Sequence, residues 1–250
     1  MRSDYVRIVA SQKIKIKAVL SASLIFILSI IAVGTKYVFH KSTVDVLNDS
    51  VAYTIVIDAG HGGVDSGTSA ADGTPEKEIN LQIAHKLNDV LRSFGVETVM
   101  IRTEDISIHD ESAKTIRQKK VSDIKNRLSI INNTDNAIYV SIHQNHYLDS
   151  KYTGTQVFYS KNNPDSEVFA KKIRASVVSI LQKDNTREIK QSGKEIYLLN
   201  NAQVPAVMVE CGFMSNEKET ELLKNSDYQQ KLAFVIALGI CDYINSSEDV

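Results

Sequence analysis

Two histidines and two glutamates stand at the borders of predicted secondary-structure elements. His61 follows a short strand through a glycine-rich bend, in IVIDAGHGG, and His143 directly follows the strand AIYVSI. Glu210 closes the strand VPAVMVE, and Glu76 begins a predicted helix. Because open α/β sheets bind ligands beyond the carboxyl ends of their strands, we expect these four side chains to converge at one edge of a sheet.

These residue types are suited to metal-assisted hydrolysis. Two imidazoles and one carboxylate form the ligand set of a catalytic zinc ion that keeps water in its fourth position. His61, Glu76 and His143 would bind Zn²⁺, and Glu210 would act as the general base on that water. Each residue also has a simpler interpretation: the imidazoles could be tolerated in a loop or at a strand end, and Glu76 could only stabilise a helix N-terminus. The combination, more than any single residue, indicates a metal site.

Asp58 and Asn145 are candidates for a supporting role around the ligands. Asp58 ends the predicted strand before His61, and Asn145 lies two residues after His143. They could orient the imidazoles through hydrogen bonds, or serve only strand-end and turn structure.

Rival sites are weaker. His146 lies in an extended or loop segment and would not face the same way as His143. The glycines around His61 match neither G-x-G-x-x-G nor a P-loop, which would need a lysine. Cys211 neighbours Glu210 on a strand, so its side chain points to the opposite face. The remaining histidines are expected in a segment before the first strand, on a helix surface and in a loop (His40, His85 and His109).

Strands and helices alternate along the chain, as the hydrophobic periodicity indicates. Strands are predicted over 53–58, 96–101, 137–142, 154–160 and 204–210, and helical faces within 76–94, 121–131, 173–181 and 232–239. A long surface loop is expected over 103–120. Because several strands are apolar throughout, we predict a three-layer α/β/α domain with a mostly parallel central sheet.

The N-terminal region has the composition of a targeting segment. The first seventeen residues carry five basic residues and one acidic residue, and an uncharged run follows in AVLSASLIFILSIIAVG. This pattern predicts a signal peptide or membrane anchor over 1–34, a tether over 35–52 and an exported domain over 53–250. The net charge of −1 does not indicate a nucleic-acid binder. Two cysteines cannot form a disulfide framework, and we expect both Cys211 and Cys241 to be buried thiols.

Four ordered motifs resemble those of the zinc-dependent N-acetylmuramoyl-L-alanine amidases: IVIDAGHGGVDSG, PEKEINL, YVSIHQN and VPAVMVECGFMSNEKE. The resemblance spans about residues 53–245. It implies that His61, Glu76 and His143 bind one Zn²⁺ and that Glu210 is catalytic. It also implies a peptidoglycan substrate, cleaved at the amide between N-acetylmuramic acid and L-alanine. The alternative activity is that of a zinc carboxypeptidase or endopeptidase acting within the stem peptide.

Within the family, the sequence is most similar to the sporulation amidases, which implies a role in spore cortex maturation through muramic-δ-lactam formation. The stretch from Ile116 to Ile131, TGTQVFYS, and Thr186-Arg187 carry this similarity. Two departures are Cys211, where a small or aliphatic residue is more usual, and Asn200, where many members have arginine. Peptidoglycan hydrolases are usually restrained, and we expect regulation by expression, by location at the extracytoplasmic face or by an accessory protein.

Overall fold

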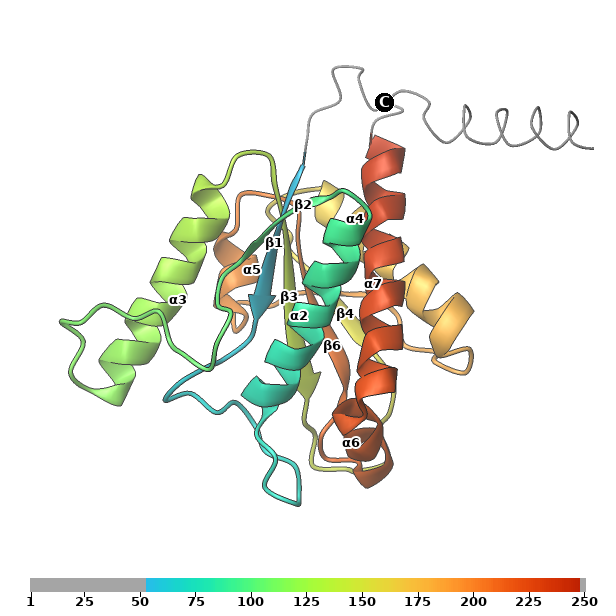
Figure 1. The fold of residues 1–250 in the computed structure, drawn as a ribbon, viewed down its shortest axis with the longest axis horizontal. Coiled ribbons are helices and arrows are strands. Elements are labelled where there is room, and N and C mark those ends of the chain that lie inside the picture. The colour runs from blue at the N-terminus through green and yellow to red at the C-terminus, as the bar shows by residue number, and fades with distance from the viewer. Residues whose placement is uncertain (1–52, 248–250) are drawn as a thin grey trace, which may run out of the picture. The chain divides into compact units, whose positions relative to one another are not determined.

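The computed structural model describes residues 53–247, which fold as a mixed α/β domain around one six-stranded sheet (Figure 1). The strands are β1 (Thr54–Ala59), β2 (Glu97–Met100), β3 (Ala137–Asn145), β4 (Gln156–Tyr159), β5 (Lys190–Gln191) and β6 (Ala206–Phe213). The helices are α2 (Glu76–Ser93), α3 (Ile116–Asn133), α4 (Asp165–Ser176), α5 (Tyr197–Asn201), α6 (Glu217–Lys224) and α7 (Ser226–Ser247). A π-helical turn, Val177–Leu181, continues α4.

The sheet is largely parallel, as predicted. Its strand order is β2-β1-β3-β6-β4-β5, and every neighbouring pair is parallel except β4 and β6. The carboxyl ends of β1, β3 and β6 therefore lie at one edge. The register pairs Asp58 with Ser141 and His143 with Glu210 across these strands.

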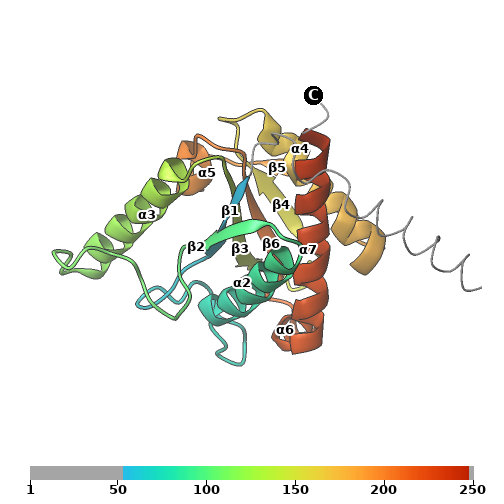
Figure 2. The same cartoon turned by 45° about the horizontal axis from the view of Figure 1, so that its top comes forward.

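Alternate residues of each strand enter two separate cores, which makes the domain three-layered. Ile55 and Ile57 of β1 pack with residues of α2, α4 and α7. Val56, between them, packs on the other face with residues of α3 and α5. Figures 1 and 2 show α2 and α7 on one side of the sheet and α3 on the other. Gly239 lets α7 approach α4 closely, because a Cβ there would lie 2.6 Å from the Cα of Ile173.

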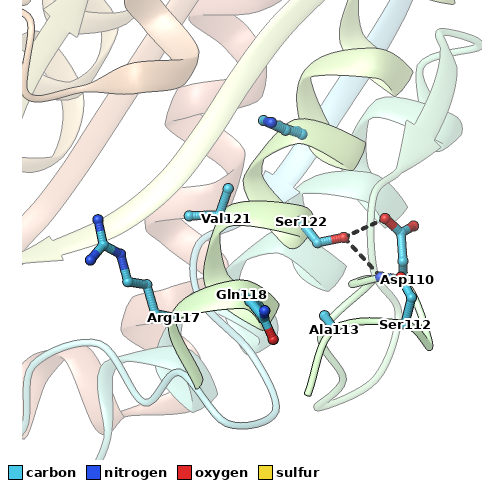
Figure 3. Close-up of a pocket in the computed structure, with 8 residues that line it drawn as sticks. Asp110, Ser112, Ala113, Arg117, Gln118, Val121 and Ser122 are labelled. Carbon is cyan, nitrogen blue, oxygen red and sulfur yellow. Dashed lines mark hydrogen bonds between the residues drawn. The ribbon is translucent and has the colours of Figure 1, made fainter. Parts of the chain in front are cut away.

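The loop predicted over 103–120 is shorter than expected, because α3 begins at Ile116. Thr115 and Gln118 form a capping box: the Gln118 amide donates to Thr115 Oγ1 at 3.2 Å, and the Thr115 amide donates to Gln118 Oε1 at 3.0 Å. The loop is also fastened to the helix side chains. Ser122 Oγ donates to Asp110 Oδ2 at 2.7 Å beside a shallow pocket (Figure 3).

Two short helices were not predicted. α5 has only five residues, and α6 has eight, which leaves little room for a periodic apolar pattern. Asn216 begins α6 by accepting a hydrogen bond from the Glu219 amide at 3.1 Å.

The predicted targeting segment, 1–34, and tether, 35–52, lie outside the described residues. Within residues 53–247, no helix combines the length and the apolar character needed to cross a membrane.

Candidate metal centre and active site

Three of the predicted site residues form a compact cluster of donor atoms. One donor atom from each of His61, Glu76 and His143 lies within 4.8 Å of the others. His61 Nε2 is 3.2 Å from Glu76 Oε2, and His143 Nδ1 is 2.9 Å from Glu76 Oε1. The two imidazole rings meet edge to face with centroids 4.9 Å apart. A loop, a helix start and a strand end thus bring their donors to one place.

His61 occupies an unusual backbone conformation that aims its ring into the cluster. Its φ is 62°, in the left-handed region, and the chain turns on through Gly62 and Gly63. Asp65 Oδ2 accepts from His61 Nδ1 at 2.9 Å, which leaves Nε2 facing Glu76. Burial alone would lower the pKa of His61, but the hydrogen bonds to Asp65 and Glu76 raise it to about 9.

Asp65 was not among the predicted site residues. Lys120 Nζ lies 2.7 Å from Asp65 Oδ1, while the other oxygen holds the imidazole. A carboxylate that bonds the outer nitrogen of a ligating histidine fixes its tautomer and orientation. Asp65 therefore occupies the supporting position that the sequence analysis assigned to Asp58. The signal that could have found it is the four-residue spacing from His61 within the same glycine-rich turn.

Glu76 is the first residue of α2 and is buried with every oxygen occupied. Oε1 accepts from the Gln144 amide at 3.1 Å and from Asn80 Nδ2 at 3.1 Å, in addition to His143. Oε2 accepts from the Thr68 amide at 3.0 Å. Burial would raise the pKa of Glu76, but hydrogen bonds from His143 and His61 hold it well below its usual range. The carboxylate is therefore fixed in place and charged.

His143 packs against Gly60, and any larger residue at this position would displace the imidazole ring. A Cβ on Gly60 would lie 2.2 Å from His143 Nε2 and 2.3 Å from Cε1. The ring thus lies directly on the backbone of the β1 loop. The register between β3 and β6 shifts after His143, at an irregularity that ends the regular pairing.

Glu210 lies next to this cluster without joining its hydrogen bonds. It pairs with His143 across β6 and β3, and part of the residue reaches the surface. Its Oε2 is nevertheless enclosed and has no hydrogen-bond partner among the described residues. Burial raises the pKa of Glu210 to about 7, and the negative charge of Glu76 acts in the same direction. A carboxylate with a near-neutral pKa and an uncommitted oxygen is suited to proton transfer.

Asp58 is buried beside the cluster but bonds neither imidazole. It accepts a hydrogen bond from Tyr139 Oη at 2.7 Å, pairs with Arg127 Nη1, and lies 3.3 Å from Ser141 Oγ. The predicted hydrogen bond from Asp58 to a histidine is therefore absent in the described structure. The geometric reason is that Arg127 lies between Asp58 and the loop: its Nη2 donates to the His61 carbonyl at 2.7 Å. Asp58 is thus linked to the backbone of His61 through this guanidinium.

Asn145 lies at the end of β3 and lines the cavity over the cluster. Its carbonyl accepts from the Met214 amide at 2.8 Å. No side-chain hydrogen bond from Asn145 to an imidazole is present among residues 53–247.

Two buried arginines hold the loop after β1, and neither was predicted. The Ala59 carbonyl accepts from Arg102 Nε at 2.8 Å and from Arg127 Nη1 at 3.1 Å. Arg102 Nη2 also donates to the carbonyls of Gly60 at 3.0 Å and Lys77 at 2.9 Å. The backbone that carries His61 is thus tied to the segment that follows β2 and to α3. Burial lowers the pKa of Arg102 to about 10.

A cavity of about 540 Å³ opens over the cluster on the face of the sheet that carries α3 and α5. Its floor includes His61, His143 and Glu210, and its walls include Ile124 of α3 and Tyr197 of α5. The size suits a substrate fragment of a few residues or sugars.

The rival residues lie away from the cluster. Cys211 is buried in the core on the opposite face of β6, as predicted, and both cysteines are free. Cys241 is only half-buried. His85 bonds the Thr103 carbonyl at 2.9 Å, and His109 bonds Ser107 at 2.9 Å. His146 is exposed, and His40 lies outside the described residues.

The comparisons with known proteins identify this domain as a hydrolase of the amidase class. The sequence profile of the N-acetylmuramoyl-L-alanine amidases matches residues 55–242, and the chain belongs to this family. It is 33% identical over 195 residues to the germination-specific N-acetylmuramoyl-L-alanine amidase of Bacillus subtilis (strain 168), covering 78% of this chain and 81% of the relative.

Solved structures agree with this assignment. The CwlD amidase from Clostridioides difficile, solved in complex with the GerS lipoprotein, is 43% identical with a TM-score of 0.75, covering 78% of this chain and 99% of that one. The N-acetylmuramoyl-L-alanine amidase from Clostridium difficile 630 is 33% identical with a TM-score of 0.67, covering 78% and 98%.

Proposed function

We propose that this protein is a zinc-dependent N-acetylmuramoyl-L-alanine amidase, which hydrolyses the amide between N-acetylmuramic acid and L-alanine of peptidoglycan. The observation that carries the proposal is the juxtaposition of the His61, Glu76 and His143 donors with the uncommitted carboxylate of Glu210. Membership of the amidase family supports the choice of bond.

The donor set fits Zn²⁺. Two imidazole nitrogens and one carboxylate oxygen are ligands that zinc takes at about 2.0–2.2 Å, and three protein ligands leave a fourth position open. The pKa of Glu76 lies well below its usual range, so it would be a charged ligand. When bound, zinc would supply a more acidic water and polarise the scissile carbonyl.

The residues of the chain would divide the remaining work. Glu210 would accept the proton of the attacking water and then donate it to the departing L-alanine nitrogen. Asp65 would hold the His61 ring through Nδ1, and Arg127 would hold its backbone carbonyl. The cavity walls would keep the scissile amide beside Glu210 and limit access of other water.

A zinc carboxypeptidase or endopeptidase cutting within the stem peptide is not favoured, because the relatives reported above are amidases. Mass spectrometry of products released from purified peptidoglycan would distinguish the activities. An amidase frees the amino group of L-alanine and leaves intact muramic acid, and a chelator should stop the release. Release of single D-amino acids, or chelator-resistant activity, would contradict the proposal.

We further propose that the enzyme acts outside the membrane, in spore cortex maturation. The similarity to a germination-specific amidase supports this role. A lipoprotein partner is proposed as well, since the CwlD amidase of Clostridioides difficile was solved with the GerS lipoprotein. Deletion of the gene should leave cortex without muramic-δ-lactam, and a cortex of normal composition would contradict the role.

A further inference from the structure

A second cavity of about 250 Å³ adjoins the catalytic one and is lined by two positively charged residues. Both cavities are lined by Asn145 and Phe158, so they are neighbours along the sheet. The second cavity is also lined by Arg187 and Lys190, together with the aromatic ring of Tyr152.

Arg187 is held in a fixed orientation. Its Nε donates to the Thr153 carbonyl at 2.7 Å, and its Nη1 donates to Gln156 Oε1 at 3.3 Å. The guanidinium carbon lies 4.4 Å from the Phe213 ring centroid and 5.4 Å from that of Tyr152. These contacts use the guanidinium face, Nε and Nη1, and Nη2 makes no hydrogen bond within residues 53–247. A guanidinium fixed in this way can donate from Nη2 to a carboxylate.

No described carboxylate forms an ion pair with Arg187, although the charge of Glu219 lies close enough to interact with it. Glu188 pairs instead with Arg174 at 2.6 Å. Glu219 Oε2 accepts from the amides of Gly154 and Phe213, at 2.9 Å each. No ion pair joins Arg187 or Lys190 to an acidic residue in the described part of the chain.

The sheet register sets the distance from the reacting bond. Gln156 lies opposite Glu210, which lies opposite His143, so Arg187 is anchored two strands away from the metal cluster. Two strand spacings are about 10 Å, and an extended peptide covers this in roughly three residues. Lys190 pairs with Phe158 on the same face and adds a second positive charge.

We propose that Arg187, assisted by Lys190, binds a free carboxylate of the stem peptide, carried by its second or third residue. This inference rests on the proposed amidase function and assigns the subsite that recognises the leaving peptide. The enzyme would thereby prefer stem peptides whose carboxylates are free over peptides in which they are amidated.

The test uses soluble muramyl tripeptides with the carboxylates of the second and third residues either free or amidated. Wild type should have a kcat/KM about 10- to 100-fold higher for the free form. In Arg187→Gln, kcat/KM for the free substrate should fall by about this factor. For the amidated substrate, kcat/KM should change less than about threefold. Lys190→Gln should show a smaller loss of the same kind. Lys161→Gln, which removes an exposed charge after β4, is the matched control and should change neither value.

If Arg187 only held the Thr153 loop in place, Arg187→Gln would lower kcat/KM equally for both substrates. This result would overturn the proposal. Equal wild-type activity on both substrates would overturn it too. Calorimetry with the zinc-loaded Glu210→Gln variant tests the subsite separately from the amidase function, because it measures peptide binding without hydrolysis. Its Kd should favour the free carboxylate by a similar factor, and adding Arg187→Gln should abolish the preference, whether or not wild type hydrolyses the amide. Equal Kd values for both peptides would contradict the subsite.

Discussion

Glu210 and His143 lie directly opposite each other on β6 and β3, yet they do not hydrogen-bond, and Glu210 Oε2 is enclosed without a partner among the described residues. By contrast, both carboxylate oxygens of Glu76 are occupied by hydrogen-bond donors. An enclosed oxygen without a partner costs free energy, so its persistence indicates a role beyond stability.

Glu210→Gln should lower kcat by about 10²- to 10⁴-fold while zinc stays bound, because the amide keeps the shape of the carboxylate but cannot accept the water proton. Zinc content by elemental analysis and product release would be measured together. His143→Ala is the contrasting variant and should lose both zinc and activity. Wild-type rates in Glu210→Gln would exclude it as the base.

Asp65→Asn should weaken zinc affinity or activity by about 10- to 100-fold, because the side chain that orients His61 through Nδ1 loses its charge. A competition titration with a chromophoric chelator gives the affinity. Lys120→Gln removes only the outer partner of Asp65 and should have a much smaller effect. Equal effects of the two variants would argue against a positioning role for Asp65.

Gly60→Ala should displace His143 and reduce zinc binding, since the new Cβ would lie 2.2 Å from the ring. Gly95→Ala is the control: its φ of 80° strains the backbone, but its Cβ would meet no atom within 4 Å. That variant should cost about 1 kcal/mol of stability with zinc binding retained. Full zinc affinity in Gly60→Ala would show that the ring can move without penalty.

Stability should fall in acid partly through Asp58. Burial would raise the pKa of Asp58, but Arg127 and Tyr139 hold it below its usual value. Because the folded pKa is depressed, Asp58 stabilises the fold above the unfolded pKa of about 3.9, and this contribution is lost as pH falls through the folded pKa. Denaturant unfolding from about pH 6 down to about pH 2 would measure the dependence.

Asp58→Asn should flatten this acid dependence and cost about 3–5 kcal/mol at pH 7, since it leaves Arg127 buried with a partner missing. Asp135→Asn, at an exposed loop position, should change neither quantity. An unaltered pH profile in Asp58→Asn would show that other carboxylates dominate the acid response.

The predicted fold followed from periodicity, and most strands and long helices are present near the predicted bounds. The convergence of His61, Glu76, His143 and Glu210 could also be predicted, because parallel strands place their carboxyl ends together. Asp58 shows the limit of this reasoning. The sequence correctly predicted that Asp58 lies near the end of a strand. Its partner, however, is an arginine of α3, and a single sequence does not show which distant elements pair.

The same limit applies to α3. Val121 belongs to the apolar spacing that predicts this helix, yet it is exposed, whereas Arg127 is buried. The inner face of α3 thus carries Arg127, which forms ion pairs with Asp58 of β1 and Asp123 of α3, in addition to apolar side chains. A buried charged residue on a helix breaks the periodic pattern, so hydrophobicity alone could not place it.

The pairing of Asp58 with Arg127 has a consequence for the order in which the protein assembles. The two residues are 69 positions apart in the sequence. The same guanidinium also donates hydrogen bonds to the carbonyl groups of Ala59 and His61. A chain that has formed β1 without docking α3 would lack the guanidinium that pairs with Asp58 and holds the carbonyls of Ala59 and His61. Closing so long a loop is also a slow event in folding. We therefore expect the active site to form late in folding, when α3 docks. A partly folded chain would then have no hydrolytic activity.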